Sequence, residues 1–353
     1  MGALTKNTII EISHDFFDQV VRPILEQEFP RETAQMTFGV FGMGSEALGM
    51  DDELSRDHHW GVRIDALMPA DVFNTKREEM LRVLDSHLPA TFQGHEMGEG
   101  LVAGAGIAPD ILPGFLARTI GIDHPPDTYE EWLSMPEEDV IHVINGEVWY
   151  DPVGEFTAIR RKLQNYYPEP VRLRRIAHWC RYFSGMGTYA LKRAILRNND
   201  LFAALAFGKA LRWGIQLAFM IDKRYFPYDK WLLAFFKRLP SLFEKIGPIV
   251  DEAVRMTASW ERKLYLLDKM SDILDSAMVK DGIIKPHPKF SGSESSGYRL
   301  LEHAYQEILK VLPQEIKTII PQQEQIHMEK FVVGYVDGLD TESWHRLLNL
   351  TES

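Results

Sequence analysis

A glycine–serine pair and an aspartate–histidine pair near the N-terminus combine residue types that bind phosphates and metal ions. Gly44 and Ser45 follow one apolar run, and Asp57 and His59 precede another. A Gly-Ser turn offers backbone N–H groups and a hydroxyl without a bulky side chain, which suits a nucleotide phosphate. A carboxylate on the next strand can hold the Mg²⁺ that bridges such phosphates. Alternation along that strand predicts Asp57 and His59 on one face and His58 on the other.

Each of these residues also has an ordinary structural explanation. Gly44 and Ser45 can form a plain turn, and Asp57 can cap a turn or a helix. His59 can be a metal ligand, a general base or a half-buried structural histidine. A neutral imidazole ligates Mn²⁺ or Zn²⁺ but suits Mg²⁺ poorly, since Mg²⁺ prefers oxygen. We expect the Gly-Ser pair to bind phosphate and Asp57 to hold the metal, and His59 stays open between these roles.

The elements around these residues predict a mixed α and β domain. Residues 8–29 have apolar side chains at helical spacing, and residues 36–42 read as a short buried strand. Residues 59–68 read as a second strand, because apolar and polar side chains alternate along them. Pro69 then stands near the start of a further helix. The first 90 or so residues therefore predict an α/β or α+β arrangement.

The next segment gives weaker signals. Residues 101–115, "LVAGAGIAPDILPGF", favour a buried strand followed by a loop, and residues 123–140 are rich in prolines and acids and indicate a surface excursion. Residues 140–152, "VIHVINGEVWYDP", predict a hairpin with Asn145 and Gly146 in a type I′ turn.

After Phe156 the chain becomes a succession of helical patterns joined by short polar or proline-containing breaks. This change predicts two domains, residues 1–160 and residues 161–353. The expected fold class is α+β, with an N-terminal mixed sheet and a C-terminal all-helical bundle.

The composition restricts the cell compartment and the kinds of partner that we expect for this protein. The net charge of −12 argues against a broad nucleic-acid surface. A single cysteine, Cys180, excludes an intramolecular disulfide framework and fits a reducing cytoplasm. The N-terminal residues lack a signal-peptide pattern, and no apolar run reaches the length of a membrane span. We therefore expect a cytoplasmic protein with no membrane partner.

Three segments resemble a known family. Residues 41–61, "FGMGSEALGMDDELSRDHHWG", are similar to the nucleotidyltransferase signature of the polymerase-β-like superfamily, and more narrowly to the bacterial nucleotidyltransferase-like proteins grouped as DUF4037. The resemblance continues through residues 130–169 and through "YFPYDKWLLAFFKRLP" at 225–240. It covers most of residues 35–240.

The resemblance implies a role for particular side chains. Gly44 and Ser45 would cradle phosphates, Asp57 would be the first metal carboxylate, and His59 stands where the superfamily has a second carboxylate. The third carboxylate has no match, because the expected strand "GLVAGAGIA" contains no acid; the nearby acids are Asp51, Asp52, Glu53, Asp65, Glu96, Glu99 and Asp123.

A cation from the helical domain contacts the triphosphate in related two-domain nucleotidyltransferases, and the resemblance makes Arg193 and Lys230 the best candidates here. A solvated helix face is the alternative for both.

Two functions follow. The first is a nucleotidyltransferase that transfers a nucleoside monophosphate from an NTP to a hydroxyl of a small molecule or protein, assisted by Mg²⁺ or Mn²⁺. The second is a catalytically impaired relative that binds a nucleotide as a sensor or partner protein.

Overall fold

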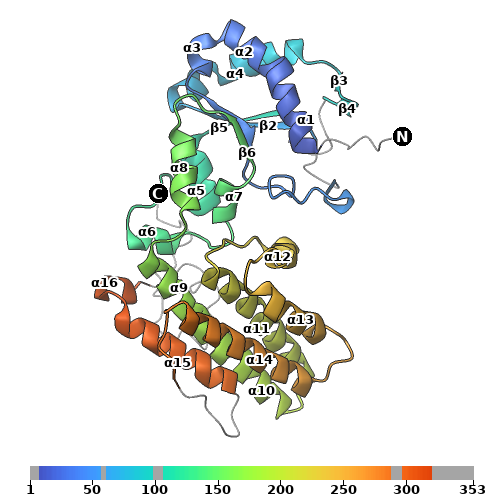
Figure 1. Ribbon diagram of the computed structural model, residues 1–353. Coiled ribbons are helices and arrows are strands. Elements are labelled where there is room, and N and C mark those ends of the chain that lie inside the picture. The colour runs from blue at the N-terminus through green and yellow to red at the C-terminus, as the bar shows by residue number, and fades with distance from the viewer. Residues whose placement is uncertain (1–7, 57–60, 98–105, 288–295, 320–353) are drawn as a thin grey trace, which may run out of the picture.

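The computed structural model describes residues 8–56, 61–97, 106–287 and 296–319 (Figure 1). The predicted α+β class is confirmed, because a mixed sheet occupies the N-terminal part and the C-terminal half consists of helices. Figure 1 shows the sheet and helices α1–α4 at one end of the molecule and the helical bundle at the other.

The main sheet has four strands in the order β5-β2-β1-β6. Strand β1 pairs antiparallel with β2 and with β6, whereas β2 and the edge strand β5 are parallel. The strand expected at 36–42 is confirmed as β1. Of the strand expected at 59–68, residues 59 and 60 lie outside the described residues, and the part from Arg63 is confirmed as β2. A separate ribbon pairs β3 with β4. The bounds are β1 Thr37–Val40, β2 Arg63–Met68, β3 Thr91–Phe92, β4 His95–Glu96, β5 Gly106–Ile111 and β6 Glu147–Tyr150.

The first core lies on one face of this sheet. Val62, Ile64 and Ala66 are buried there among side chains of the N-terminal helices and α4. The helix expected over 8–29 is confirmed as a continuous helical stretch, with a short π-helical segment between α1 and α2, and the helix after Pro69 is confirmed as α4. These elements are α1 Ile9–Phe16, the π segment Phe17–Val21, α2 Arg22–Glu28, α3 Pro30–Thr33 and α4 Ala70–His87.

The predicted hairpin at 140–152 is wrong in its first arm. Residues 140–144 form helix α7 (Val140–Ile144), whose four consecutive residues from Val140 to Val143, His142 included, are all buried. Asn145 has a φ of −88°, so the turn is not type I′, which needs a positive φ at both central residues. Gly146 is required for another reason, since a Cβ there would lie 2.0 Å from the carbonyl oxygen of Val40.

Two segments expected to be irregular contain helices. The loop predicted after the strand at 100–108 is α5 (Leu112–Ile120), which begins with a proline in its first turn and is followed by Gly121 in the left-handed conformation. The segment 123–140, predicted to lie on the surface, contains α6 (Tyr129–Ser134). A capping box of Thr128 and Glu131 begins this helix, and its Trp132 is buried.

The second core begins on the other face of the sheet and continues into the helical bundle. Phe41 and Leu67 belong to it, together with side chains of α5–α8 and of the later helices. Helices from both sides of the predicted boundary at 160 therefore share one core, and the division into residues 1–160 and 161–353 stays a prediction.

The remaining bounds are α8 Glu155–Gln164, α9 Glu169–Arg181, a π segment Tyr182–Tyr189, α10 Ala190–Ile195, α11 Asp200–Ile221, α12 Asp229–Phe236, α13 Phe243–Ala253, α14 Trp260–Lys280, α15 Ser296–Val311 and α16 Gln314–Lys317. Within the described ranges, no helix has both the length and the apolar character that crossing a membrane requires.

Candidate functional site

The Gly-Ser pair lies in a compact turn that follows β1. Gly42 and Gly44 have φ values of +79° and +137°. The Gly42 N–H donates to the carbonyl of His142 at 2.9 Å, and the Met50 N–H donates to the carbonyl of Ser45 at 2.8 Å. These hydrogen bonds thus hold the start of the turn to α7 and close its end onto Ser45.

Gly44 is a position that admits only glycine without rearrangement. A Cβ there would lie 2.4 Å from Oε1 of Glu46, and the φ of +137° is one that L side chains rarely adopt. We expect Gly44→Ala to lower the free energy of unfolding by about 2–3 kcal/mol, since a residue in such a backbone region costs on the order of 1–3 kcal/mol and the Glu46 side chain must also move. Urea denaturation measures this loss.

Gly49→Ala is the matched control for Gly44→Ala. Gly49 also has a positive φ, +68°, but nothing lies within 4 Å of a Cβ built on it. The control should therefore cost only the left-handed backbone penalty, about 1–2 kcal/mol. Equal losses in the two variants would contradict a restraint from Glu46.

Arg63 on β2 holds the turn against the sheet. Its Nη1 lies 2.8 Å from Oε1 of Glu46, and its Nη2 lies 3.3 Å from Oδ2 of Asp65. The same guanidinium donates to the carbonyls of Phe41, at 3.0 Å, and Met43, at 3.1 Å. One cation therefore joins two carboxylates and two turn carbonyls in a nearly buried cluster.

Asp65 is the acid that comes nearest to the turn along β2. It accepts a hydrogen bond from the Phe41 N–H at 2.8 Å. Burial raises the pKa of Asp65, although Arg63 and the Phe41 N–H favour its charged form. Because Glu46 and Asp65 share Arg63, neither carboxylate is an uncommitted metal ligand.

Asp57 and His59 lie outside the described residues, so their metal and catalytic roles stay predictions. The structure describes both flanks of this segment. A 3₁₀-helix ends at Arg56 on one side, and β2 begins at Arg63 on the other. The spacer acid Asp52 accepts bonds from the N–H and the hydroxyl of Ser55, so it caps this short helix.

An acid that the sequence analysis missed lies on β5. Residues 98–105 lie outside the described part of the chain, and from Gly106 the strand expected at 100–108 is β5, which continues to Ile111 and includes Asp110, opposite Leu67 of β2. The strand was not predicted to continue past Ala108 because proline is rare inside strands. Pro109 is tolerated here because β5 is an edge strand. Asp110 forms an ion pair with Arg118.

Asp110 lies at the end of the sheet away from the turn. Leu67 is opposite both Asp110 on β5 and Thr37 on β1, and Thr37 is the first residue of β1, whose far end leads into the turn. A cavity of about 390 Å³ extends along this face, and Phe41, Asp65 and Asp110 line it. Because this register puts Asp110 level with the start of β1, Asp110 is not a third carboxylate beside Gly44.

The other acids considered for the third position are placed as follows. Asp123 is exposed after α5, Asp51 is partly buried and Glu53 is exposed in the spacer, Glu99 lies outside the described residues, and Glu96 lies on β4. Among the residues that the structure describes, no group of three His, Cys, Asp or Glu side chains could hold a metal ion. The metal-binding role of Asp57 and His59 stays a prediction, and one carboxylate with one imidazole is a donor set that suits Mn²⁺ better than Mg²⁺.

Helix α12 brings the helical half onto the turn. The Trp231 indole N–H donates to Oγ of Ser45 at 3.1 Å, and Nζ of Lys230 donates to Oγ of Ser55 at 3.2 Å. Figure 1 shows the loop that follows β1 directly above α12. The Ser55 hydroxyl lowers the pKa of Asp52, and Lys230 acts in the same direction. The structure thus places α12 against the loop that contains Gly44 and Ser45, with Trp231 at Ser45 and Lys230 ten residues further along, at Ser55.

Arg193 is not brought to this turn. Its side chain is exposed on α10 and lies over the Tyr189 ring, with 5.9 Å between the guanidinium carbon and the ring centroid. Figure 1 places α10 at the end of the bundle opposite α12. Trp231, by contrast, is not among the predicted site residues; it is 9% exposed, and its indole N–H reaches the turn.

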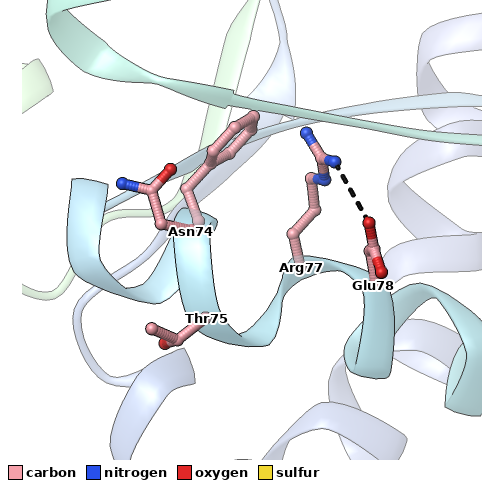
Figure 2. Close-up of a pocket in the computed structure, with 5 residues that line it drawn as sticks. Asn74, Thr75, Arg77 and Glu78 are labelled. Carbon is pink, nitrogen blue, oxygen red and sulfur yellow. Dashed lines mark ion pairs between the residues drawn. The ribbon is translucent and has the colours of Figure 1, made fainter.

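A small hollow on α4 is unrelated to this site. Figure 2 shows Asn74, Thr75, Arg77 and Glu78 around it, with Arg77 directed toward Glu78 at 3.7 Å. Its volume is about 130 Å³ and its lining comes from one helix, so it is too small for a nucleotide.

Comparison with known proteins gives one family match. Residues 132–232 match the family model described as "Domain of unknown function (DUF4037)", which confirms the expected resemblance over that range. The match begins in α6 and ends in α12, so it includes Lys230 and Trp231 but not Gly44. Among solved structures, a nucleotidyltransferase-like protein from Exiguobacterium sibiricum 255-15 is similar at 13% identity and a TM-score of 0.37, over 83% of this chain and 90% of that chain. None of the curated proteins matches this chain.

Proposed function

We propose that this chain, which contains the DUF4037 match, is a nucleotidyltransferase that binds a nucleoside triphosphate between the Gly44-Ser45 turn and α12. The observation that carries the proposal is the contact of Lys230 and Trp231 with the loop that follows β1. Turn N–H groups, a serine hydroxyl and one ammonium group are the donors that a triphosphate needs.

The proposed reaction transfers a nucleoside monophosphate to a hydroxyl of a small molecule or protein. The hydroxyl oxygen bonds to the α-phosphorus, the bond from that phosphorus to the oxygen bridging to the β-phosphate breaks, and pyrophosphate leaves. The hydroxyl proton passes to a base, for which His59 is the candidate. If His59 is the base, it is not a ligand, and Asp57 with an acid not yet placed would hold a divalent ion, Mn²⁺ or Mg²⁺. Otherwise Asp57 and His59 would hold that ion. When bound, the ion would neutralise triphosphate charge.

A second candidate function is a nucleotide-binding sensor without catalysis. The Arg63 contacts with Glu46 and Asp65 favour it, because they commit two nearby carboxylates to a structural cation. His59 favours it as well, since it stands where the superfamily has a carboxylate.

Calorimetry with ATP, CTP, GTP and UTP, each with Mg²⁺ and then Mn²⁺, tests the proposal. We expect metal-dependent binding of at least one nucleotide. Lys230→Ala should weaken it about tenfold, because one charge-assisted hydrogen bond is lost. The control is Lys237→Ala, an exposed lysine beyond the end of α12.

Asp57→Ala separates the two functions. Loss of the metal dependence in this variant supports the transferase. Nucleotide binding that needs no divalent ion and is unchanged in Asp57→Ala favours the sensor, and absence of binding to all four nucleotides rejects both.

A further inference from the structure

A second cavity lies where α7, α8 and α11 meet the end of α12. Its volume is about 470 Å³, within the range of small-molecule sites. Phe219, Tyr225 and Phe235 contribute apolar and aromatic walls, and the amide side chains of Asn145 and Gln164 contribute polar groups. The lining thus combines an apolar body with a few polar groups, as ligand sites do.

The charged residues that line this cavity are all positive. Lys223, Arg224 and Arg238 line it, and its lining contains no Asp or Glu. Lys223 pairs with Glu169 at 3.5 Å. Within the part of the chain that the structure describes, neither Arg224 nor Arg238 forms an ion pair with a carboxylate. Two guanidinium groups are therefore available to an anion from outside.

The backbone at the cavity adopts an unusual conformation. Tyr166 and Lys223 have φ values of +71° and +53°, and they are two of the four non-glycine residues with a positive φ in the described ranges. Each follows the end of a helix, α8 or α11, at a place where glycine or asparagine is usual. Such conformations tend to occur at ligand sites, because the surrounding structure must hold them.

The cavity adjoins the proposed nucleotide site but has its own lining. Residues 231, 235 and 238 are spaced along α12 and the turn after it. Trp231 contacts Ser45, Phe235 lines the cavity, and Nη2 of Arg238 lies 3.2 Å from Sδ of Met50 in the turn. Arg238 also lies over the Phe235 ring, at 4.9 Å from the centroid, which holds its guanidinium at the cavity edge.

We propose that this cavity is a second binding site, which takes a small molecule with an apolar body and an anionic carboxylate or phosphate group. The apolar walls would receive the body, Arg224 and Arg238 the anion, and the amides of Asn145 and Gln164 further polar groups. The proposal does not depend on nucleotide transfer, because none of the lining residues is part of the proposed nucleotide site.

Saturation-transfer NMR with three matched probes tests this site on the full chain. The probes are 3-phenylpropionate, phenyl phosphate and the neutral 3-phenylpropanol. We expect one or both anions to bind, and the neutral alcohol to bind at least about tenfold more weakly, because it has no negative charge to pair with the guanidinium groups. The two anionic probes distinguish a carboxylate ligand from a phosphate ligand.

Variants assign the binding to this cavity. Arg224→Ala should weaken the anionic probe about tenfold, and Asn145→Asp should weaken it further by placing a like charge beside it. Arg255→Ala, which removes an exposed arginine that does not line the cavity, should leave the affinity unchanged. Circular dichroism establishes that each variant is folded.

Three results would overturn the proposal. The first is no binding of either anion, and the second is equal binding of the neutral probe with no effect of Arg224→Ala. The third is full displacement of the probe by ATP together with equal weakening of both ligands in Lys230→Ala, which would make the cavity part of the nucleotide site. Probe binding that persists in Lys230→Ala supports the second site even if no nucleotide binds.

Discussion

Replacing Glu137 with alanine should lower the free energy of unfolding by about 3–5 kcal/mol, because it leaves a buried guanidinium without its partner. Glu137 and Arg175 are both fully buried, with Nη1 of Arg175 at 2.6 Å from Oε1 of Glu137. The Trp179 indole N–H donates to the other carboxylate oxygen at 2.7 Å. Two buried donors would therefore lose their acceptor at once.

The position of this pair in the fold enlarges the effect. Glu137 lies between α6 and α7, whereas Arg175 and Trp179 lie on α9. Arg175 also donates to the carbonyls of Trp132 and Met135, at 2.7 and 3.0 Å, so it joins the connecting helices to the bundle. Because α7 in turn contacts the Gly44 turn through His142, loss of the pair should also loosen the candidate site.

Urea denaturation of three proteins tests this prediction. Glu130→Ala is the matched control, since Glu130 is exposed on α6, and it should change stability by less than about 0.5 kcal/mol. In the double variant Glu137→Ala/Arg175→Met both charges are absent, so part of the loss should be recovered. A loss below about 1 kcal/mol in Glu137→Ala would contradict a tightly coupled buried pair.

The sequence predicted the elements whose hydrophobic pattern is regular. Strands β1 and β2, the N-terminal helical stretch and the long helices α9, α11 and α14 all have the expected apolar spacing. Helix α7 was missed because it is short and its residues from Val140 to Val143 are all buried, so no hydrophobic period distinguishes a helix from a strand there. The family resemblance pointed to the DUF4037 segment, which the match at 132–232 confirms.

The sequence predicted the candidate site only in part, because long-range contacts decide it. Helix α12 and the loop after β1 are far apart in the sequence, and only the docking of α12 brings Trp231 to Ser45 and Lys230 to Ser55. Arg193 has the same charge and a similar helical setting, so composition could not separate it from Lys230. The ion pairs of Arg63 with Glu46 and Asp65 were not predicted, because strand alternation gives the face of a side chain but not its partner.

Replacing Arg63 with methionine should destabilise the protein by about 3–5 kcal/mol near neutral pH, because it leaves Glu46 and Asp65 without the cation between them. The carbonyls of Phe41 and Met43 also lose their donors. Arg63→Lys should be intermediate, since a single ammonium lacks the planar fork that reaches four oxygen atoms. Arg31→Met, an exposed arginine on α3, is the control and should have little effect.

The pH dependence of the Arg63→Met variant distinguishes lost charge from lost packing. Burial already raises the pKa of Asp65, and removal of Arg63 takes away an interaction that opposes this shift. A carboxyl whose pKa is raised in the folded state binds more protons there than in the unfolded chain, so falling pH stabilises the fold. Relative to the wild type, the variant should therefore recover stability between about pH 7 and pH 5, above the unfolded carboxyl pKa near 4. A deficit that is constant over this interval, measured by urea denaturation at each pH, would mean that Arg63 contributes through packing and hydrogen bonds alone, and that the carboxylates of Glu46 and Asp65 do not depend on its charge.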